Sequence, residues 1–295
     1  MDDPRLRRHP LGYMEVIEKP KPSELREYYA ERYFQTNQGN YRTEYGLPER
    51  AYIEAKIRQK AHIVFNHRGG KPGSFLDVGC GEGFAMSYFQ REGWKVEGLD
   101  YSSVGLVAMN PHLSDVLVTG DVISLLSQRI NGAQAYDVIW LHNVLEHIAE
   151  PADLLVKLGQ ILAQDGLVVV TVPNDFSKVQ ELLLEAKHID SFFWVALPDH
   201  LAYFNADSLL SIAEATGYKR LRFLADFPID WFLLHPDSNY VQDRSRGPAA
   251  HEARIQIENL LNTLPVDAVN RFYEGMADVG LGRQITAFLT RKLPE

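Results

Sequence analysis

The chain has 295 residues and 45% apolar content, enough for one large α/β domain with an insertion or for two small domains. Its formal net charge of −9 disfavours a nucleic-acid substrate, because an acidic surface repels a polyanion. The single cysteine, Cys80, excludes an internal disulfide framework and fits a reducing compartment. No apolar run reaches membrane-spanning length and the N-terminus has no apolar signal core, so we expect a cytoplasmic protein.

The N-terminal part is predicted to be a helical lead-in over residues 1–66. Residues 1–22 carry four prolines without a clear period, which predicts an irregular segment. Ser23 can cap a helix that runs to about residue 33. A second helix is expected over residues 49–66, where an apolar stripe recurs at helical spacing: Ile53, Ile57, Ala61 and Val64. These helices either form a lid over a cofactor cleft or cover one edge of a sheet.

From residue 74 onward, strand-like and helix-like segments alternate, which predicts a mostly parallel sheet within a domain spanning residues 67–295. The expected strands are 74–79, 95–100, 115–118, 136–141, 166–172, 219–226 and 284–290. The expected helices between them are 84–92, 102–110, 121–130, 151–163 and 177–188, with Asp165-Gly166 ending the fourth. Residues 227–282 are too long for a turn and are predicted to be a helical insertion before the last strand. The fold class is therefore α/β, a Rossmann-like seven-stranded sheet with helices on both faces.

The first strand of this domain ends in a glycine-rich loop that predicts a ligand site. The sequence from Phe75 to Phe84 reads Phe-Leu-Asp-Val-Gly-Cys-Gly-Glu-Gly-Phe, a strand followed by a turn and a helix start. A dinucleotide fingerprint requires its third glycine at the position of Phe84. The carboxylate of Asp77 beside the loop would repel a pyrophosphate but suits a cationic ligand that carries an amino acid.

Further polar residues follow the ends of the other predicted strands, where ligands bind in open α/β sheets. Asp100 ends the second strand and can accept from both ribose hydroxyls of a nucleoside. Asp121 follows the third strand, where it can accept from an adenine amino group or simply cap a helix. His142 ends the fourth strand and can also be a hydrogen-bonded core residue.

Together these motifs resemble the class I S-adenosylmethionine-dependent methyltransferases, in the small-molecule branch that includes ubiquinone and glycan-cluster enzymes. The resemblance covers about residues 74–226 and includes Asp199-His200-Leu201-Ala202-Tyr203-Phe204, which is similar to a signature of that branch. It implies S-adenosyl-L-methionine as the cofactor. The implied cofactor-binding residues are Asp77, Gly79, Cys80, Gly81, Gly83, Asp100, Tyr101, Asp121, Val122 and His142.

The resemblance implies methyl transfer to a hydroxyl or amine of a small molecule, with a sugar-containing or natural-product acceptor. Alignment of nucleophile, methyl and sulfur supplies much of the acceleration, and a histidine suits the role of base. The candidate bases are His200, which we rank first, His147 and His142. The predicted acceptor-binding residues are Tyr203, Trp194 and Trp231, each of which can equally belong to the core.

One position departs from the pattern of the quinone O-methyltransferases, which carry Glu-x-x-Glu-His after the fourth strand, a set implicated in divalent metal binding. The first position here is Asn143, so only Glu146 and His147 of that set are present. We therefore predict no metal and no activity on the ubiquinone precursor.

Three other functions stay open at this point. A nicotinamide-dependent oxidoreductase is opposed by Phe84, and a non-catalytic methyltransferase-like scaffold is opposed by the intact loop and its acids. Methylation of protein or RNA is disfavoured by the acidic charge. A small-molecule acceptor is the expected partner, and a homodimer is left open.

Overall fold

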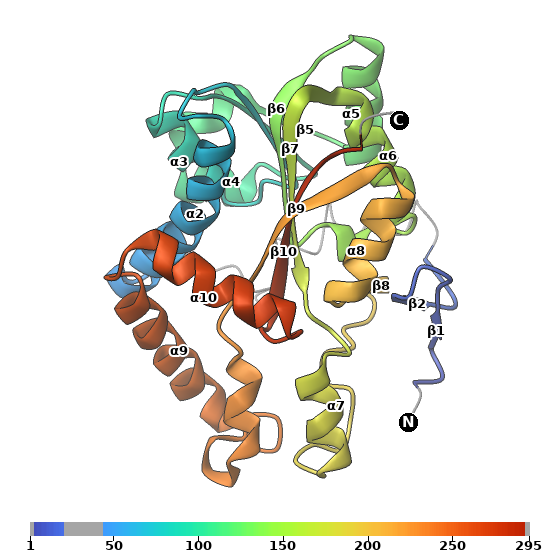
Figure 1. The fold of residues 1–295 in the computed structure, drawn as a ribbon, viewed down its shortest axis with the longest axis vertical. Coiled ribbons are helices and arrows are strands. Elements are labelled where there is room, and N and C mark those ends of the chain that lie inside the picture. The colour runs from blue at the N-terminus through green and yellow to red at the C-terminus, as the bar shows by residue number, and fades with distance from the viewer. Residues whose placement is uncertain (1–2, 21–43, 293–295) are drawn as a thin grey trace.

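The computed structural model describes residues 3–20 and 44–292, and its centre is a seven-stranded sheet (Figure 1). The strands lie in the order β5-β4-β3-β6-β7-β10-β9. Their bounds are β3 Ser74–Val78, β4 Lys95–Asp100, β5 Leu117–Thr119, β6 Tyr136–His142, β7 Leu162–Pro173, β9 Tyr218–Ala225 and β10 Gln284–Arg291. This architecture confirms the predicted fold class.

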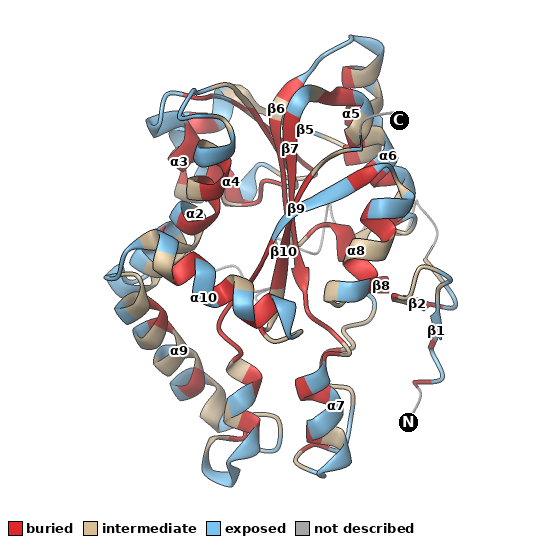
Figure 2. Cartoon of the chain, viewed as in Figure 1, coloured by how far each residue is buried: buried red, intermediate tan, exposed pale blue. Residues whose placement is uncertain are grey.

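Four neighbouring strand pairs are parallel, from β5 across to β7, and β10 runs antiparallel to both β7 and β9. The parallel part is covered on both faces, which is why its strands are almost continuously apolar. In β7, the run from Leu167 to Val170 is completely buried. Figure 2 shows the central strands of the sheet as a buried layer between helices with exposed outer surfaces, whereas the edge strand β9 is partly exposed.

Helices cover the two faces in the order that right-handed crossovers require. One face carries α2 (Leu47–His67), α3 (Phe84–Arg91) and α4 (Val104–Met109), and the other carries α5 (Val122–Asn131), α6 (Pro151–Ile161) and α8 (Ala206–Ala215) (Figure 1). The second predicted N-terminal helix is thus present as α2. The first, at 24–33, lies outside the described residues.

The N-terminal segment differs from the predicted irregular lead-in. Strands β1 (Leu6–Arg8) and β2 (Met14–Val16) form a hairpin, and β2 pairs antiparallel with β8 (Ala202–Tyr203). This pairing depends on a segment almost 190 residues further along the chain, so local sequence gives little sign of it. The small sheet is backed by a second apolar cluster that includes residues of α7 (Lys178–Glu185).

The segment between β9 and β10 contains three short 3₁₀ turns, at Ile229–Leu234, Pro236–Ser238 and Arg244–Arg246, and two helices. These helices are α9 (Gly247–Leu261) and α10 (Val266–Asp278), and both contact α2. A buried carboxylate, Glu258 of α9, accepts from Lys56 of α2 and from the hydroxyl of Tyr273 of α10. The insertion is thereby fixed against the N-terminal helix.

Two predicted boundaries are wrong for physical reasons. The third strand begins at Leu117, because residues 111–116 form a 3₁₀ turn opened by Pro111. Helix α6 ends at Ile161, and Asp165-Gly166 lies inside β7, not at the helix end. The register of β7 against β6 shifts at that point, so the polar pair occupies an irregularity of the strand. Within residues 3–20 and 44–292, no helix has the length and apolar character needed to cross a bilayer.

Candidate active site

A cavity of about 1230 Å³ opens beyond the carboxyl ends of the parallel strands. It lies at the point where the chain order reverses, between β3 with its neighbour β4 on one side and β6 on the other. This is the position at which open α/β sheets bind ligands. Its wall comes from the loop after β3, the ends of β4 and β6, helix α2 and the segments that flank β10. Every residue predicted to bind the cofactor lies on this wall.

The glycine loop owes its conformation to backbone angles that other residues rarely adopt. Gly79, Gly81 and Gly83 have φ values of 73°, 53° and 74°. At Gly79 a Cβ atom would also lie 2.5 Å from Cγ2 of Val144, in the loop after β6. Glycine is therefore needed here partly for protein packing, and not only for the approach of a ligand.

Two acidic side chains at the strand ends, Asp77 and Asp100, line this part of the cavity. Asp100 accepts hydrogen bonds from the backbone N–H groups of Gly81 (2.8 Å) and Ser102 (3.0 Å). Burial, together with the nearby Asp100, raises the pKa of Asp77 to about 8. Burial also raises the pKa of Asp100, although its backbone hydrogen bonds oppose the shift. In the described part of the chain, no cationic side chain pairs with either acid.

Asp121 has the structural role that the sequence left open and also lies on the cavity wall. Its carboxylate caps α5 by accepting from the backbone N–H of Ser124 at 2.8 Å. The hydroxyl of Tyr101 donates to the other carboxylate oxygen at 2.7 Å. Val122 lies beside Asp121 on the wall, and Cys80 lines the glycine loop. Burial raises the pKa of the Cys80 thiol, which therefore stays protonated.

The middle of the cavity contains a buried lysine that the sequence analysis missed. Lys60 of α2 donates to Oγ1 of Thr171 at 3.1 Å, and its Nζ lies 3.3 Å from Nδ1 of His142. Burial and the neighbouring Lys56 lower the pKa of Lys60 to about 7. Burial and Lys60 lower the pKa of His142 well below its ordinary value, so its imidazole is neutral near pH 7.

A signal for Lys60 was present in the sequence. The residue falls on the apolar stripe of α2, three positions after Ile57 and four before Val64. A lysine on the buried face of a helix needs an internal partner or a function. Its partners, His142 and Thr171, are more than 80 residues away, so the sequence could not name them.

The far wall of the cavity is formed by polar residues around β9 and β10. Arg283 contributes to it and pairs with Asp175 at 2.7 Å. The guanidinium of Arg254 lies 5.3 Å from the ring centroid of Tyr52. The Nε atom of Arg254 is buried and has no hydrogen-bond partner among the residues described. This part of the wall therefore carries two guanidinium groups, of which that of Arg283 is paired with a carboxylate.

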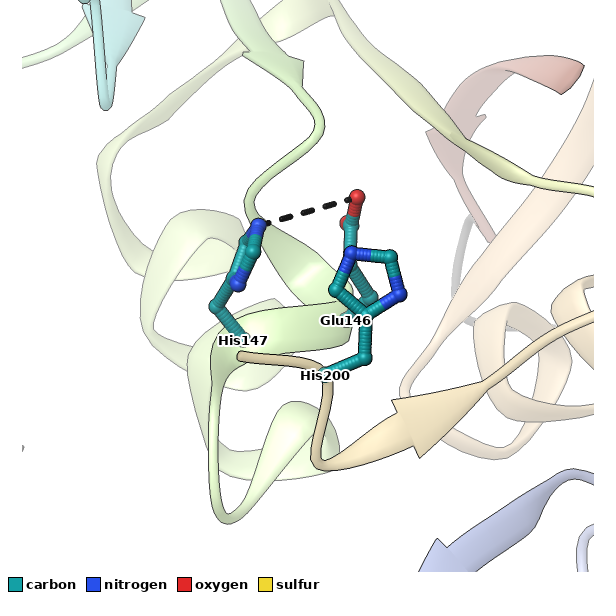
Figure 3. A group of neighbouring side chains, drawn as sticks. All are labelled: Glu146, His147 and His200. Carbon is teal, nitrogen blue, oxygen red and sulfur yellow. Dashed lines mark ion pairs between the residues drawn. The ribbon is translucent and has the colours of Figure 1, made fainter. Parts of the chain in front are cut away.

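The histidines proposed as bases divide into two groups. His142 and His147 line the cavity, whereas His200 lies beside His147 and Glu146 outside the lining set (Figure 3). The rings of His147 and His200 meet edge to face at 4.9 Å between centroids. Burial lowers the pKa of His147 and lowers that of His200 to about 3, so both are neutral near pH 7.

The residues proposed to bind the acceptor are not on the cavity wall. Tyr203 and Trp194 are buried in the second apolar cluster, where both rings contact Phe176. Trp231 lies in the first 3₁₀ turn after β9 and is 43% exposed. The aromatic run around Trp194 thus packs beneath the N-terminal sheet, because its rings complete an apolar core there.

Comparison with known proteins assigns the family. A sequence model described as a methyltransferase domain matches residues 50–222, more than half of the chain. The chain belongs to this methyltransferase-domain family. The match covers the glycine loop, the three acidic strand ends and all of β6, so it confirms the family that the motifs indicated.

Individual relatives of this methyltransferase-domain chain are distant. Residues of the chain are 24% identical over 151 positions to a ubiquinone biosynthesis O-methyltransferase of Bradyrhizobium sp. strain ORS 278, covering 48% of this chain and 60% of that protein. A protein of the same name from Yersinia enterocolitica is 32% identical over 108 residues, covering 35% and 43%. A methyltransferase structure from Archaeoglobus fulgidus matches with a TM-score of 0.51 at 18% identity, covering 82% and 94%, which supports the fold.

We predict that Gly79→Ala destabilises the protein by roughly 2–4 kcal/mol. Positive φ costs an alanine about 1 kcal/mol or more, and the contact with Val144 adds steric strain. Gly70→Ala is a matched control, because Gly70 has φ +74° and nothing within 4 Å of the added Cβ. Chemical denaturation of both variants measures the difference. If both variants lost the same free energy of unfolding, the contact between the added Cβ and Val144 would contribute nothing to the destabilisation.

Proposed function

We propose that this chain transfers a methyl group from S-adenosyl-L-methionine to a hydroxyl or amine of a small molecule. The observation that carries the proposal is the pair of buried acids, Asp77 and Asp100, beside three glycines in the left-handed region. Because no cationic side chain of the described residues neutralises them, this end of the cavity suits a ligand that brings ammonium and hydroxyl donors.

The wall residues match the parts of such a donor. Asp100 has a fixed orientation, held by two backbone N–H groups, and suits the ribose hydroxyls. The loop from Asp77 to Gly83 suits the amino-acid end, and Asp121 with Val122 suits the adenine. When bound, the sulfonium supplies an electrophilic methyl whose bond to sulfur breaks as the bond to the acceptor forms.

The alternatives fit this cavity less well. An oxidoreductase would have to place a pyrophosphate beside Asp77 and Asp100, where no cationic side chain of the described residues meets it, and Phe84 stands in the place of the third glycine. A non-catalytic scaffold does not need a buried lysine in the cavity whose pKa is lowered to about 7, as that of Lys60 is. A large macromolecular acceptor is disfavoured by the net charge of −9.

We propose Lys60 as the group that takes the proton from the acceptor, with His142 beside it. A general base works best when its pKa lies near the operating pH, and the pKa of Lys60 is about 7. The neutral His142 is a weaker base because its pKa is far lower. His200, ranked first from the sequence, is not among the lining residues, so it is not part of this mechanism.

The acceptor is proposed to bind between Lys60 and the far wall that Arg254 and Arg283 help to form. Charged and hydrogen-bonding side chains there suit an acceptor rich in oxygen atoms. This supports the sugar-containing or natural-product class that the sequence resemblance indicated. The two curated relatives named above match this chain over at most 60% of their own length. The proposal therefore rests on the residues of this chain and not on the activity of those relatives.

We predict micromolar binding of S-adenosylhomocysteine by isothermal titration calorimetry and at least ten-fold weaker binding by Asp100→Ala. Asp100→Ala removes the carboxylate that would accept hydrogen bonds from the two ribose hydroxyls, and this loss costs about 1.5–3 kcal/mol of binding free energy because the lost hydrogen bonds involve a charged group. Asp115→Asn, a substitution at an exposed acid, is the control and should leave affinity unchanged. Absence of binding, or preferential binding of a dinucleotide, would reject the proposed donor.

We predict that turnover rises with pH to a plateau above an apparent pKa near 7. The reason is the sign of the Lys60 ionisation, because only its deprotonated form accepts a proton, and that form grows as pH rises. Transfer of a labelled methyl group to a panel of sugar and phenolic acceptors, followed across pH, measures the profile.

Two substitutions of Lys60 distinguish a role as general base from a role in which its positive charge only holds the acceptor in place. Lys60→Met should lower turnover by about 10²-fold or more and remove the ionisation near pH 7. Lys60→Arg keeps a permanent positive charge and cannot act as a base, so it should be as slow as Lys60→Met. An active Lys60→Arg enzyme would assign Lys60 an anchoring role instead.

A further inference from the structure

One arginine on the cavity wall, Arg254 of α9, lacks the acidic partner that neighbouring basic residues have. Lys56 pairs with Glu258 at 3.3 Å, and Arg283 pairs with Asp175 at 2.7 Å. Among the residues that the structure describes, Arg254 forms no ion pair with a carboxylate. A guanidinium that lines a cavity without an acid beside it suits an anionic group of a ligand.

The guanidinium of Arg254 is held in place without being neutralised. Its Nη2 lies 2.9 Å from Nδ1 of His251, one turn earlier in α9. Because arginine only donates, Nδ1 of His251 is the acceptor, so the imidazole is neutral and carries its hydrogen on Nε2. That Nε2 lies 3.3 Å from Oε1 of Glu49, and the face of the guanidinium lies over the ring of Tyr52. Within the described part of the chain, Nη1 and the buried Nε of Arg254 have no hydrogen-bond partner.

The charges around this corner of the cavity limit the kind of anion that fits. The acids Asp226 and Glu258 both lie close enough to Tyr52 to act on it electrostatically. Asp226 accepts from two backbone N–H groups at 2.7 Å each, and Glu258 accepts from Lys56. One guanidinium without an acid therefore meets two acids nearby that repel any added negative charge. This balance favours a carboxylate, with a single charge, over a phosphate dianion.

We propose that Arg254 binds a carboxylate at the end of the acceptor opposite to the atom that is methylated. This inference rests on the proposed methyl transfer and names the class of acceptor. Tyr52, which holds Arg254, and Lys60, the proposed base, lie on the same helix and both line the cavity. Their eight-residue separation corresponds to roughly 12 Å along α2. The acceptor is therefore a hydroxy acid about two rings long, such as a disaccharide that contains a uronic acid.

The size of the cavity agrees with an acceptor of this length. Its volume of about 1230 Å³ exceeds the roughly 300–1,000 Å³ of a pocket for a single small ligand. The cavity therefore has room for a nucleoside-bearing donor beside Asp100 and for a second molecule between Lys60 and Arg254. A hydroxy acid with one ring is too short to contact both of these side chains.

The test is calorimetric titration of the full chain with a hydroxybiphenyl carboxylic acid whose two polar groups lie at opposite ends. The matched probe is its carboxamide, which has the same shape without the charge. Each is titrated with and without S-adenosylhomocysteine. The acid should bind about ten-fold or more tightly than the carboxamide, because its hydrogen bonds to Arg254 are charge-assisted. It should also bind more tightly than para-hydroxybenzoic acid, which carries the same two groups on one ring.

Substitutions of Arg254 connect the preference for the acid to this side chain. Arg254→Gln should bind the acid and the carboxamide within about two-fold of each other, because it removes the charge. Arg254→Lys keeps the charge but loses the planar fork, so its preference should be smaller than that of the parent. Arg244→Gln, at an exposed arginine of the same insertion, is the matched control and should keep the full preference. Circular dichroism establishes which variants are folded, and their affinity for S-adenosylhomocysteine should be unchanged.

The outcomes separate this proposal from that of the methyl donor. Equal binding of acid and carboxamide by the parent, binding of neither, or a preference that persists undiminished in folded Arg254→Gln or Arg254→Lys would overturn it. Equal affinity for the one-ring and two-ring acids would overturn the assigned length. Absence of S-adenosylhomocysteine binding would reject the proposed donor alone, because titrations without it measure the preference for the acid independently.

Discussion

The hydrogen bond from the backbone N–H of Gly81 to the carboxylate of Asp100 joins the ends of two neighbouring strands, and the site depends on it. It ties the turn after β3 to the end of β4 and fixes the direction of the acid. The turn can reach Asp100 because its glycines adopt positive φ. One buried charge thus sets the loop geometry and the negative potential of the cavity, which together select the donor.

The opposite end of the cavity has a different electrostatic character. Arg254 and Arg283 lie there. Lys60, which also lines the cavity, has a pKa that burial and the neighbouring Lys56 lower to about 7. Lys60 belongs to α2, Arg254 belongs to α9, and Arg283 directly precedes β10. The buried Glu258 of α9 links this helix to Lys56 of α2 and to Tyr273 of α10. The distribution of charged groups in the cavity therefore follows from the fold. The ends of the parallel strands supply acids, and α2, α9 and the residue before β10 supply basic side chains.

Sequence reasoning succeeded where the signal is local. The glycine loop was predicted from the strand–glycine–helix pattern between Phe75 and Phe84. The acids at the strand ends were placed together without knowledge of distant contacts, because parallel strands end at one edge of a sheet. It failed where partners are distant. The pairing of β2 with β8, the burial of Trp194 and the contact between Lys60 and His142 join segments that only the folded chain brings together. Tyr203 and Trp194, which the sequence assigned either to the acceptor site or to the core, pack in the second apolar cluster.

The most direct test of the central claim is a crystal structure of the full chain with S-adenosylhomocysteine. The account predicts that the ribose hydroxyls contact Asp100, that the amino acid lies along the loop from Asp77 to Gly83, and that the sulfur faces Lys60 and His142. A ligand bound away from Asp100, or a cavity that stays empty at saturating ligand while the protein is intact, would contradict it.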